Sequence, residues 1–438
     1  MSKQLKLGIL LAVAVILSIS TWFYSGRILK AEQVAYAASH GIPRGNLSDL
    51  YPRWFGAREL LKNRRNPYSP EITREIQQGY YGRPLDPSRP NDPKDHQGFA
   101  YPVYVVFLLA PTVDLPFEEV RIGFRWLLIV LAVVSVWLWL RLLRWNPPCL
   151  EMAIYAVLIV GWLPMVQGIR LQQLTLLVAV FFGLCTTCLA GGWFLCAGGL
   201  LALATIKPQL AWPLVLWLLL WSVSEWRSRR RFAFGFGLVM LLLFGGAELL
   251  LPGWLLMFVR GLGQYHQYTQ NVSVLVWMFG SILGRILELA SIVGCAAVIW
   301  PIRREPATSA EFGRATALVL ALSVLVVPMF APYNQVLLVP AMMALIRSST
   351  SSTRLLPVIR LARMAGAFAV AWPWIASLGL CVTYLLLRGF TPDMLNRPWV
   401  WGFPLTSNFL VPIFVFGLAL ADVWLSNTRG LRDSATPE

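Results

Sequence analysis

Long apolar runs alternate with short polar breaks along almost the whole chain. Most of these runs are roughly 18 to 24 residues long, enough to cross a hydrocarbon layer about 30 Å thick at a rise of 1.5 Å per residue. The pattern therefore predicts an all-α polytopic membrane protein with about twelve transmembrane helices. The predicted spans are residues 6–26, 122–143, 149–166, 171–190, 192–206, 208–223, 232–251, 277–300, 315–330, 333–347, 364–387 and 405–426.

One apolar run departs from this pattern. The stretch from Tyr101 to Pro116 is about 16 residues long, which is short for a span, and it contains Pro102, Pro111 and Asp114. Because proline interrupts a helix, we expect this run to be interfacial or re-entrant. The predicted organisation is then a first transmembrane anchor at 1–26, an extracytoplasmic loop with interfacial or re-entrant helices at 27–121, core transmembrane helices at 122–347, and C-terminal transmembrane helices with a short cytoplasmic tail at 348–438.

Positive charges gather at the ends of the apolar runs. Hydrophobic residues make up 57% of the 438 residues and charged residues 13%, and the formal net charge is +16. Short clusters of cations at helix ends indicate membrane topology rather than nucleic-acid binding. With the amino terminus inside, the alternation of spans places these basic clusters in the cytoplasm: Arg141 and Arg144; Arg227 and Arg229 to Arg231; Arg303 and Arg304; residues 347–363; Arg429 and Arg432. We therefore predict a multi-pass protein of the cell (plasma or inner) membrane, with both termini cytoplasmic.

The first apolar run could be a signal peptide, and the cysteines could form disulfide or metal sites. A loose cleavage motif, Ala35-Tyr36-Ala37, lies about ten residues too far beyond the first run for a signal peptide, so we interpret that run as an uncleaved anchor. The six cysteines are scattered through or beside apolar runs. The sequence therefore predicts neither a disulfide framework nor a metal site.

The segment from Arg27 to Ala100 is polar, with twelve basic and eight acidic residues. Within it, Ser48-Asp49 is followed by an amphipathic pattern, which predicts an N-cap and a helix lying along the membrane surface. Asn66-Pro67-Tyr68 ends that helix, and the residues from Leu85 to Gly98 are predicted to form an irregular loop.

Several motifs resemble those of one known family. They are Asp49 in the polar stretch, Asn66-Pro67-Tyr68, Phe99-Ala100-Tyr101-Pro102, Gln172-Gln173-Leu174-Thr175, Lys207-Pro208, and Gln270-Asn271-Val272-Ser273 with Arg285 downstream. From about residue 49 to residue 340 the chain thus resembles the GT-C membrane glycosyltransferases, and most closely glycosyltransferase family 87, which uses polyprenyl-phosphate mannose. Two positions depart from the family pattern: Val103 replaces a second proline, and residues 331–334 lack a histidine that is often found there.

The resemblance implies an extracytoplasmic glycosyltransferase. It would move a sugar, mannose in this branch of the family, from a polyprenyl-phosphate donor to a lipid or glycan acceptor by a metal-independent inverting mechanism, without a cofactor. A lipid-linked donor suits this location because nucleotide sugars are confined to the cytoplasm. The expected partners are this donor, the acceptor and membrane lipids, with no nucleic acid.

The resemblance makes Asp49 the candidate general base, which would take the proton of the acceptor hydroxyl. The alternative is that Asp49 only caps the helix that follows it. For the leaving phosphate, the predicted binding residues are Lys207, Arg285, Arg121 and Arg170, because cations at the membrane boundary are costly unless they have a role.

Two of these cations have competing explanations. Arg285 could pair with Glu288 one turn further along its helix. Lys207 could reach for lipid headgroups instead. Sugar or acceptor contacts are predicted for five polar and aromatic residues, namely His266, Gln172, Asn271, Tyr101 and Asn334; His266 could equally be a solvated loop residue.

Two other classes of protein share this kind of sequence. A lipid or solute transporter or flippase also has many spans with inner termini, but no internal repeat is evident here. A surface-glycan polymerase or ligase usually centres its chemistry on large later loops, whereas the largest loop of this chain comes first.

Overall fold

The computed structural model describes residues 2–44, 48–269, 271–328, 331–351 and 357–435. Over these ranges the chain is all helical, without a β-strand. Six helical segments are long and apolar enough to cross a membrane. They are the continuous run of α1 (Lys3–Phe23), the π-helix η1 (Tyr24–Leu29) and α2 (Lys30–Ser39), followed by α6 (Phe117–Leu142), α12 (Trp226–Leu250), α15 (Ser281–Ile299), α18 (Pro357–Leu386) and α22 (Leu410–Ala435).

Shorter helices fill the space between these spans. Two of them, α7 (Cys149–Val160) and α8 (Leu163–Leu171), form one span bent by 59° or a re-entrant pair. Three further apolar helices are α9 (Thr175–Ala190), α10 (Phe194–Ala204) and α11 (Pro208–Ser224). The bundle also contains α16 (Ala310–Val326) and α17 (Val339–Ser351). The polytopic all-α class is confirmed, while the count of twelve spans stays a prediction.

Some predicted boundaries differ from the structure for local reasons. The first helix continues past residue 26 to Ser39, because Gly26 alone does not end it and no proline occurs before Pro43. The predicted span 149–166 is broken after Val160, and a new helix begins at Leu163, with Trp162 as its N-cap residue and Pro164 in its first turn. The predicted span 333–347 begins as the 3₁₀ helix η4 (Pro332–Leu338) before α17.

The polar segment folds as a small helical layer. It contains α3 (Tyr51–Asn63), α4 (Pro70–Tyr81), α5 (Val105–Leu109) and the 3₁₀ turn η2 (Ala110–Thr112). Arg65 forms ion pairs with Glu59 of α3 (2.9 Å) and Glu75 of α4, which holds these helices together. The Trp54 indole donates to the carbonyl oxygen of Thr112 (3.1 Å). The stretch after Tyr101 contains the five-residue helix α5, which packs against α3. This helix is far too short to span a bilayer.

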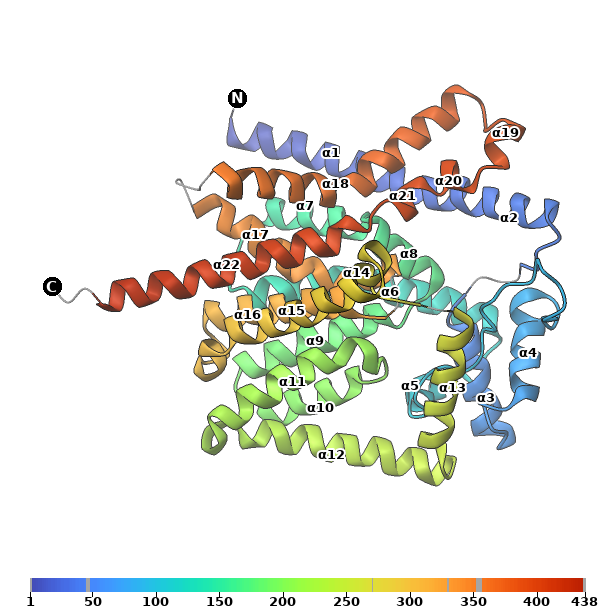
Figure 1. Cartoon of the computed structure of the whole chain (residues 1–438), viewed down its shortest axis with the longest axis horizontal. Helices are drawn as coiled ribbons and strands as arrows, with labels where there is room; N and C mark the ends of the chain where they lie inside the picture. Colours follow the sequence, from blue (N-terminus) through green and yellow to red (C-terminus); the bar gives the residue numbers. More distant parts are fainter. Residues whose placement is uncertain (1, 45–47, 270, 329–330, 352–356, 436–438) are drawn as a thin grey trace.

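The remaining short elements lie between spans. They are α13 (Trp254–Thr269), α14 (Val274–Phe279), the 3₁₀ turn η3 (Pro301–Arg304), and three single turns, α19 (Pro392–Leu395), α20 (Pro398–Trp401) and α21 (Phe403–Thr406). In Figure 1, α13 and α4 run across the direction of α12 at the end of the bundle that also carries α3 and α5.

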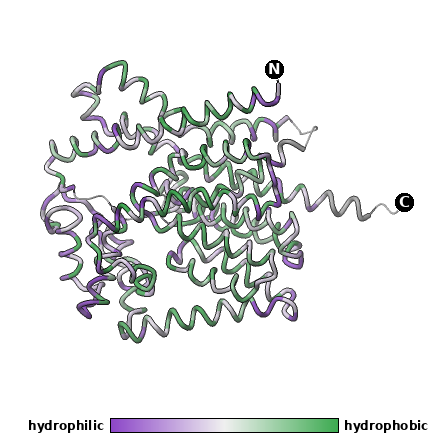
Figure 2. Tube along the Cα trace, turned by 180° about the vertical axis from the view of Figure 1, so that it is seen from behind, coloured by the Kyte–Doolittle hydropathy of each residue, from purple (hydrophilic) through white to green (hydrophobic). Residues whose placement is uncertain are grey.

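The two ends of the bundle differ in polarity. The start of α1 and the end of α22 lie at one end, and the layer of α3 and α4 lies at the other (Figure 1). Figure 2 shows hydrophilic residues over that layer and long hydrophobic stretches between the two ends. The chain is thus arranged as a membrane bundle with one large polar layer on one side.

Contacts between helix ends bring the basic clusters together. Arg229 donates to the carbonyl oxygens of Arg303 (2.9 Å) and Arg304 (2.7 Å). Arg347 donates to the carbonyl oxygen of Leu143, next to another basic cluster. These pairings are those expected if the basic clusters share one side of the membrane.

Candidate functional site

A cavity of about 650 Å³ lies where the polar layer meets the bundle. We call it the Asp49 cavity. Its walls come from the start of α3, the loop before Tyr101, the turn between α8 and α9, the turn between α10 and α11, α13, and the segment before η4. The lining includes Asp49, Arg53, Asp95, Gln97, Tyr101, Gln173, Lys207, Gln209, Trp212, Leu262, Tyr265, His266, Asn271 and Tyr333.

Asp49 is held in place from two sides. Its backbone N–H donates to the carbonyl oxygen of Leu171 (2.9 Å), which ties the polar segment to the end of α8. Its carboxylate accepts hydrogen bonds from Nε2 of Gln173 and from the Tyr80 hydroxyl (3.3 Å). The predicted N-cap is wrong in register, since α3 begins at Tyr51 with Leu50 as its cap residue. The Asp49 carboxylate therefore faces the cavity rather than the helix amides.

The surroundings of Asp49 make its ionised form costly. Burial raises the pKa of the Asp49 carboxyl above its usual range, and the nearby charge of Asp95 adds to that rise. The charges of Arg53 and Lys207 and the hydrogen bond from Gln173 act in the opposite direction but do not cancel the rise. A carboxylate with a raised pKa is a stronger base than an exposed one.

Lys207 lies in the turn between α10 and α11 and is only 3% exposed. Its Nζ donates to Oε1 of Gln173 (2.8 Å) and to Oγ1 of Thr175 (2.7 Å). It also lies over the ring of Tyr333, 5.1 Å from the centroid. α10 ends at Ala204, and Pro208 begins α11. The lysine side chain occupies the break between these two helices.

Arg53 supplies a second cation beside Asp49. Its Nη1 donates to the Asp49 carbonyl oxygen (2.5 Å), and its guanidinium lies 4.6 Å from the ring centroid of Tyr101. Asp95 also lines the cavity, and burial raises the pKa of its carboxyl group. The cavity therefore holds two carboxyl groups and two cations.

Several predicted contact residues meet in this cavity, whereas one lies behind its wall. Tyr101, His266 and Asn271 line it, with His266 on α13. Asn334 is buried, and its Oδ1 accepts a hydrogen bond from Thr175 (3.1 Å), which in turn accepts one from Lys207. Asn334 thus supports Lys207 from behind.

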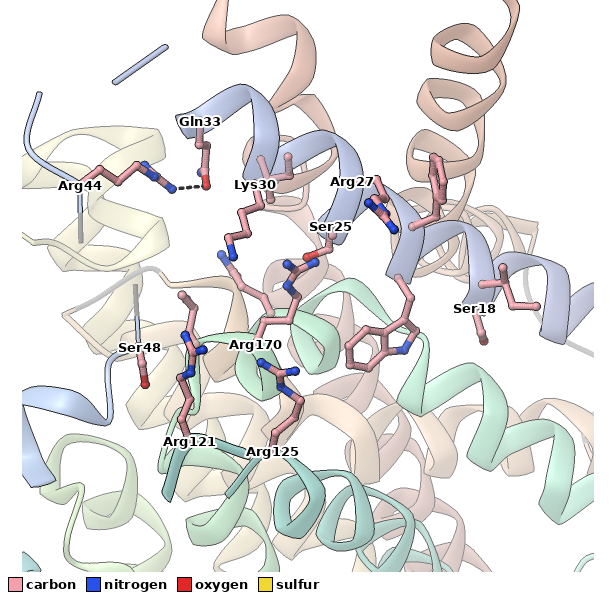
Figure 3. A pocket seen from close by; sticks show the side chains of 17 residues that line it. Ser18, Ser25, Arg27, Lys30, Gln33, Arg44, Ser48, Arg121, Arg125 and Arg170 are labelled. Atoms are coloured by element: carbon pink, nitrogen blue, oxygen red, sulfur yellow. Dashed lines mark hydrogen bonds between the residues drawn. The ribbon is translucent and has the colours of Figure 1, made fainter. Parts of the chain in front are cut away.

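Three other predicted residues belong to a separate, cationic cavity of about 890 Å³ or to its wall. Arg121 of α6 and Arg170 of α8 line that cavity (Figure 3). Gln172, in the turn after α8, accepts a hydrogen bond from the Ser48 hydroxyl and donates one to the carbonyl oxygen of Arg121. The side-chain amide of Gln172 thus links Ser48 to Arg121 in the wall between the two cavities.

Arg285 lies apart from both cavities. It is exposed on α15, on a surface with Ile282 and Ile286, which are 78% and 57% exposed. No ion pair joins Arg285 to Glu288, although the structure describes both residues. Arg285 and the Asp49 cavity therefore share no contact.

Four residues close to Asp49 were not among the predicted site residues: Gln173, Arg53 and Asp95, which line the cavity, and Tyr80, which donates a hydrogen bond to the Asp49 carboxylate. Gln173 had a signal, because two adjacent glutamines interrupt an apolar stretch. Arg53, Asp95 and Tyr80 lie in a segment rich in charged and aromatic residues, where nothing in the local pattern distinguishes them.

No cluster of three or more His, Cys, Asp or Glu side chains that could hold a metal ion occurs among the described residues. The paired groups of the Asp49 cavity suit proton transfer and stabilisation of an anion. A buried carboxylate can accept a proton, and the cations beside it can stabilise a departing anion. Trp212 and Leu262, each more than a third exposed, give the cavity an apolar rim.

Comparison with known proteins gives one match. The sequence model described as glycosyltransferase family 87 matches residues 99–328, more than half of the 438 residues. No protein of curated function and no solved structure matches the chain. The matched range includes Tyr101, Gln173, Lys207 and His266, whereas Asp49 lies before it.

Proposed function

The chain belongs to glycosyltransferase family 87, and from this premise we propose that it transfers mannose from a polyprenyl-phosphate donor to a lipid or glycan acceptor outside the cytoplasm. That it is a membrane-embedded glycosyltransferase follows from the family and the helical bundle. The donor, the acceptor, the sugar and the mechanism belong to the proposal.

One observation carries the proposal. A single side-chain amide, that of Gln173, donates to the Asp49 carboxylate and accepts from Lys207 Nζ. The amide thereby fixes a base and a cation on one wall of the same cavity. Glycosyl transfer needs this pair, because a proton must leave the attacking hydroxyl while negative charge develops on the leaving phosphate.

In the proposed reaction, the Asp49 carboxylate takes the proton of the acceptor hydroxyl as that oxygen attacks the anomeric carbon. The bond between the anomeric carbon and the phosphate oxygen breaks, and the electron pair leaves with the polyprenyl phosphate. Attack from the face opposite the phosphate inverts the anomeric configuration. The proton rests on Asp49 until it is lost to water.

We assign the donor phosphate to Lys207 and Arg53. Both side chains line the Asp49 cavity, and Arg53 can offer a guanidinium with two parallel N–H groups to phosphate oxygens. Of the other predicted phosphate ligands, Arg121 and Arg170 face the second cavity and Arg285 lies on an exposed helix surface. They are therefore left out of this assignment.

The remaining lining suits the other parts of the substrates. The rim of Trp212 and Leu262 offers apolar surface for the isoprenoid chain beside the phosphate. His266 and Asn271 offer hydrogen bonds to sugar hydroxyls, and Tyr101 offers a ring face. Family membership favours a function as an enzyme over a function as a transporter or flippase.

The proposed function can be tested with purified protein in lipid vesicles. Given radiolabelled polyprenyl-phosphate mannose and a panel of lipid acceptors, the protein should form a labelled lipid whose new linkage is inverted relative to the donor. The same vesicles with a nucleotide sugar as the only donor should give no product. Transfer from the nucleotide sugar alone would overturn the proposal.

A further inference from the structure

The second cavity is lined by six cationic side chains. We call it the arginine cavity, and its cations are Arg27, Lys30, Arg44, Arg121, Arg125 and Arg170. Figure 3 shows Lys30 pointing down from α2, Arg170 reaching up from α8, and Arg121 and Arg125 pointing into the same space from α6. Side chains from three separate parts of the chain therefore converge on one volume of about 890 Å³.

These charges have little compensation within the protein. The lining residues include no aspartate or glutamate, and Arg121 is the one lining cation with an ion pair among the described residues, to Glu118 (2.5 Å). Glu118 is itself 63% exposed at its side chain. Repulsion from Arg170, Arg121, Arg125 and Arg44 acts on Lys30. Like charges gathered this closely favour binding of an anion.

The cavity is built to hold these groups. The helix widens to π-helical geometry from Tyr24 to Leu29, and residues of this segment form one wall. Gly26 lets Arg170 approach that wall closely, because a Cβ at Gly26 would lie only 2.8 Å from Nη1 of Arg170. Arg44 is oriented by Gln33, whose Oε1 accepts from its Nη2 (2.6 Å).

The other half of the cavity is apolar. Ile19, Trp22 and Phe23 of α1 line it, and Ile19 is 63% exposed. From Ser18 to Lys30 the helix rises by about 18 Å. Along this helix the cavity therefore has an apolar lining before Tyr24 and a cationic lining from Arg27 onward.

A thin wall separates the arginine cavity from the Asp49 cavity. Ser48 lines the arginine cavity and Asp49 lines the other, and Gln172 and Gln173 bind these two residues from the opposite side. A ligand in the arginine cavity thus contacts neither the carboxylate of Asp49 nor Lys207. Its binding can be measured without sugar transfer.

We propose that the arginine cavity is a second lipid site, which binds the phosphate headgroup of a membrane lipid with the lipid tail along Ile19 and Trp22. Guanidinium groups bind phosphate oxygens in pairs through charge-assisted hydrogen bonds. The apolar wall selects a phosphate that carries a hydrocarbon chain over a free one. The lipid is held beside the wall that positions Asp49.

Equilibrium binding to the full-length protein in a neutral detergent tests this site. The probes are dihexanoyl phosphatidylglycerol, farnesyl phosphate, dihexanoyl phosphatidylcholine and inorganic phosphate. We expect at least one of the two anionic lipids to bind about tenfold tighter than both phosphatidylcholine and inorganic phosphate. The anionic lipid that binds identifies the source of the phosphate. Inorganic phosphate binding as tightly as the lipids would overturn the proposal.

Variants locate the binding. The double variant Arg125→Gln, Arg170→Gln should weaken binding of the anionic lipid about tenfold or more. The matched control Arg58→Gln, Arg74→Gln removes the same charge from exposed residues of α3 and α4 and should change binding less than about twofold. If the double variant does not fold, the single variant Arg125→Glu, at an exposed position of α6, replaces it as the test of binding. Equal losses in the control and in the cavity variants would contradict the assignment.

Discussion

At the scale of single residues, Gln173 has the most consequential position in the Asp49 cavity. Its two amide atoms contact groups of opposite charge, the carboxylate of Asp49 and the ammonium of Lys207. A glutamine does this without adding charge of its own, because its amide donates through nitrogen and accepts through oxygen. We therefore interpret Gln173 as a positioning residue for the proposed base and for the proposed phosphate ligand.

This interpretation predicts the behaviour of Gln173→Leu. The hydrogen bond from Gln173 lowers the pKa of Asp49, so its loss should raise that pKa further and move the acidic limb of the kcat/KM profile to higher pH. We expect kcat to fall more than KM changes. The control Gln78→Leu, at an exposed position of α4, should keep the wild-type profile. An unshifted acidic limb in Gln173→Leu would contradict the positioning role.

The raised pKa of Asp49 also predicts an effect on stability. Because burial raises the pKa in the folded state, the stability from Asp49 is fully present below about pH 4, its unfolded pKa, and is lost as the pH rises through the folded pKa. At neutral pH the charge of Asp49 is therefore a cost, and Asp49→Asn should raise Tm.

The control for this experiment is Asp114→Asn. Asp114 is exposed, and Lys62 lowers its pKa. Since a lowered pKa marks a charge that the folded state favours, Asp114→Asn should not raise Tm at neutral pH. A Tm for Asp49→Asn below that of the wild-type protein would show that the charge of Asp49 stabilises the folded state.

At the scale of elements, the turn between α8 and α9 joins the polar layer to the bundle. Gln172 adopts a left-handed conformation there, with φ 56° and ψ 48°, at the end of α8. This conformation turns the chain so that the side chains of Gln172 and Gln173 bind two adjacent residues, Ser48 and Asp49. The pair of adjacent glutamines is visible in the sequence, but the geometry of the turn is not, because glutamine has no special preference for the left-handed region.

Substitutions at Gln172 separate the backbone from the side chain. Gln172→Gly keeps the left-handed conformation but loses the hydrogen bonds to Ser48 and Arg121. Gln172→Val loses both features, and a β-branched residue pays an additional conformational cost of roughly 1–2 kcal/mol in the left-handed region. We expect Tm to fall in the order wild type, Gly, Val. Equal Tm values for the Gly and Val variants would argue against a role for this backbone conformation.

The helices themselves were the most predictable elements, and their ends the least. Apolar runs long enough to cross a bilayer identify α6, α12, α15 and α22 directly. The break between α7 and α8, the start of α3 at Tyr51 and the extension of the first helix to Ser39 depend on packing and local backbone geometry.

The geometry of the candidate site was equally hard to predict from the sequence. Asp49 and Lys207 carried family motifs, but their link through Gln173 depends on contacts between residues 124 and 34 positions apart.

At the scale of the whole molecule, the polar layer of α3 and α4 lies at the end of the bundle opposite the start of α12, which carries the basic cluster of Arg227 and Arg229 to Arg231 (Figure 1). The sequence predicted this separation from charge alone, because each basic cluster follows or precedes a span. The cytoplasmic placement of the basic end remains a prediction. It requires the stretch from Tyr101 to Pro116 to stay on the outer side, as its short buried helix α5 favours.

Cysteine labelling tests this topology. In a variant with the native cysteines replaced, Glu119→Cys at the exposed start of α6 should react with a membrane-impermeant maleimide in intact cells. A second variant that keeps exposed Cys149 as its single cysteine should react only after the membrane is permeabilised. The reverse pattern would place the Asp49 cavity on the cytoplasmic side.

In the proposed reaction Asp49 is the base for sugar transfer, and paired substitutions in one transfer assay are the sharpest check of that role. Wild type, Asp49→Asn and Asp114→Asn are reconstituted in vesicles at equal density and given polyprenyl-phosphate mannose and acceptor. We expect Asp49→Asn to lower kcat by roughly 10²- to 10⁴-fold, while Asp114→Asn, exposed and outside the cavity, keeps the wild-type rate. Turnover by Asp49→Asn at the wild-type rate would exclude Asp49 as the base.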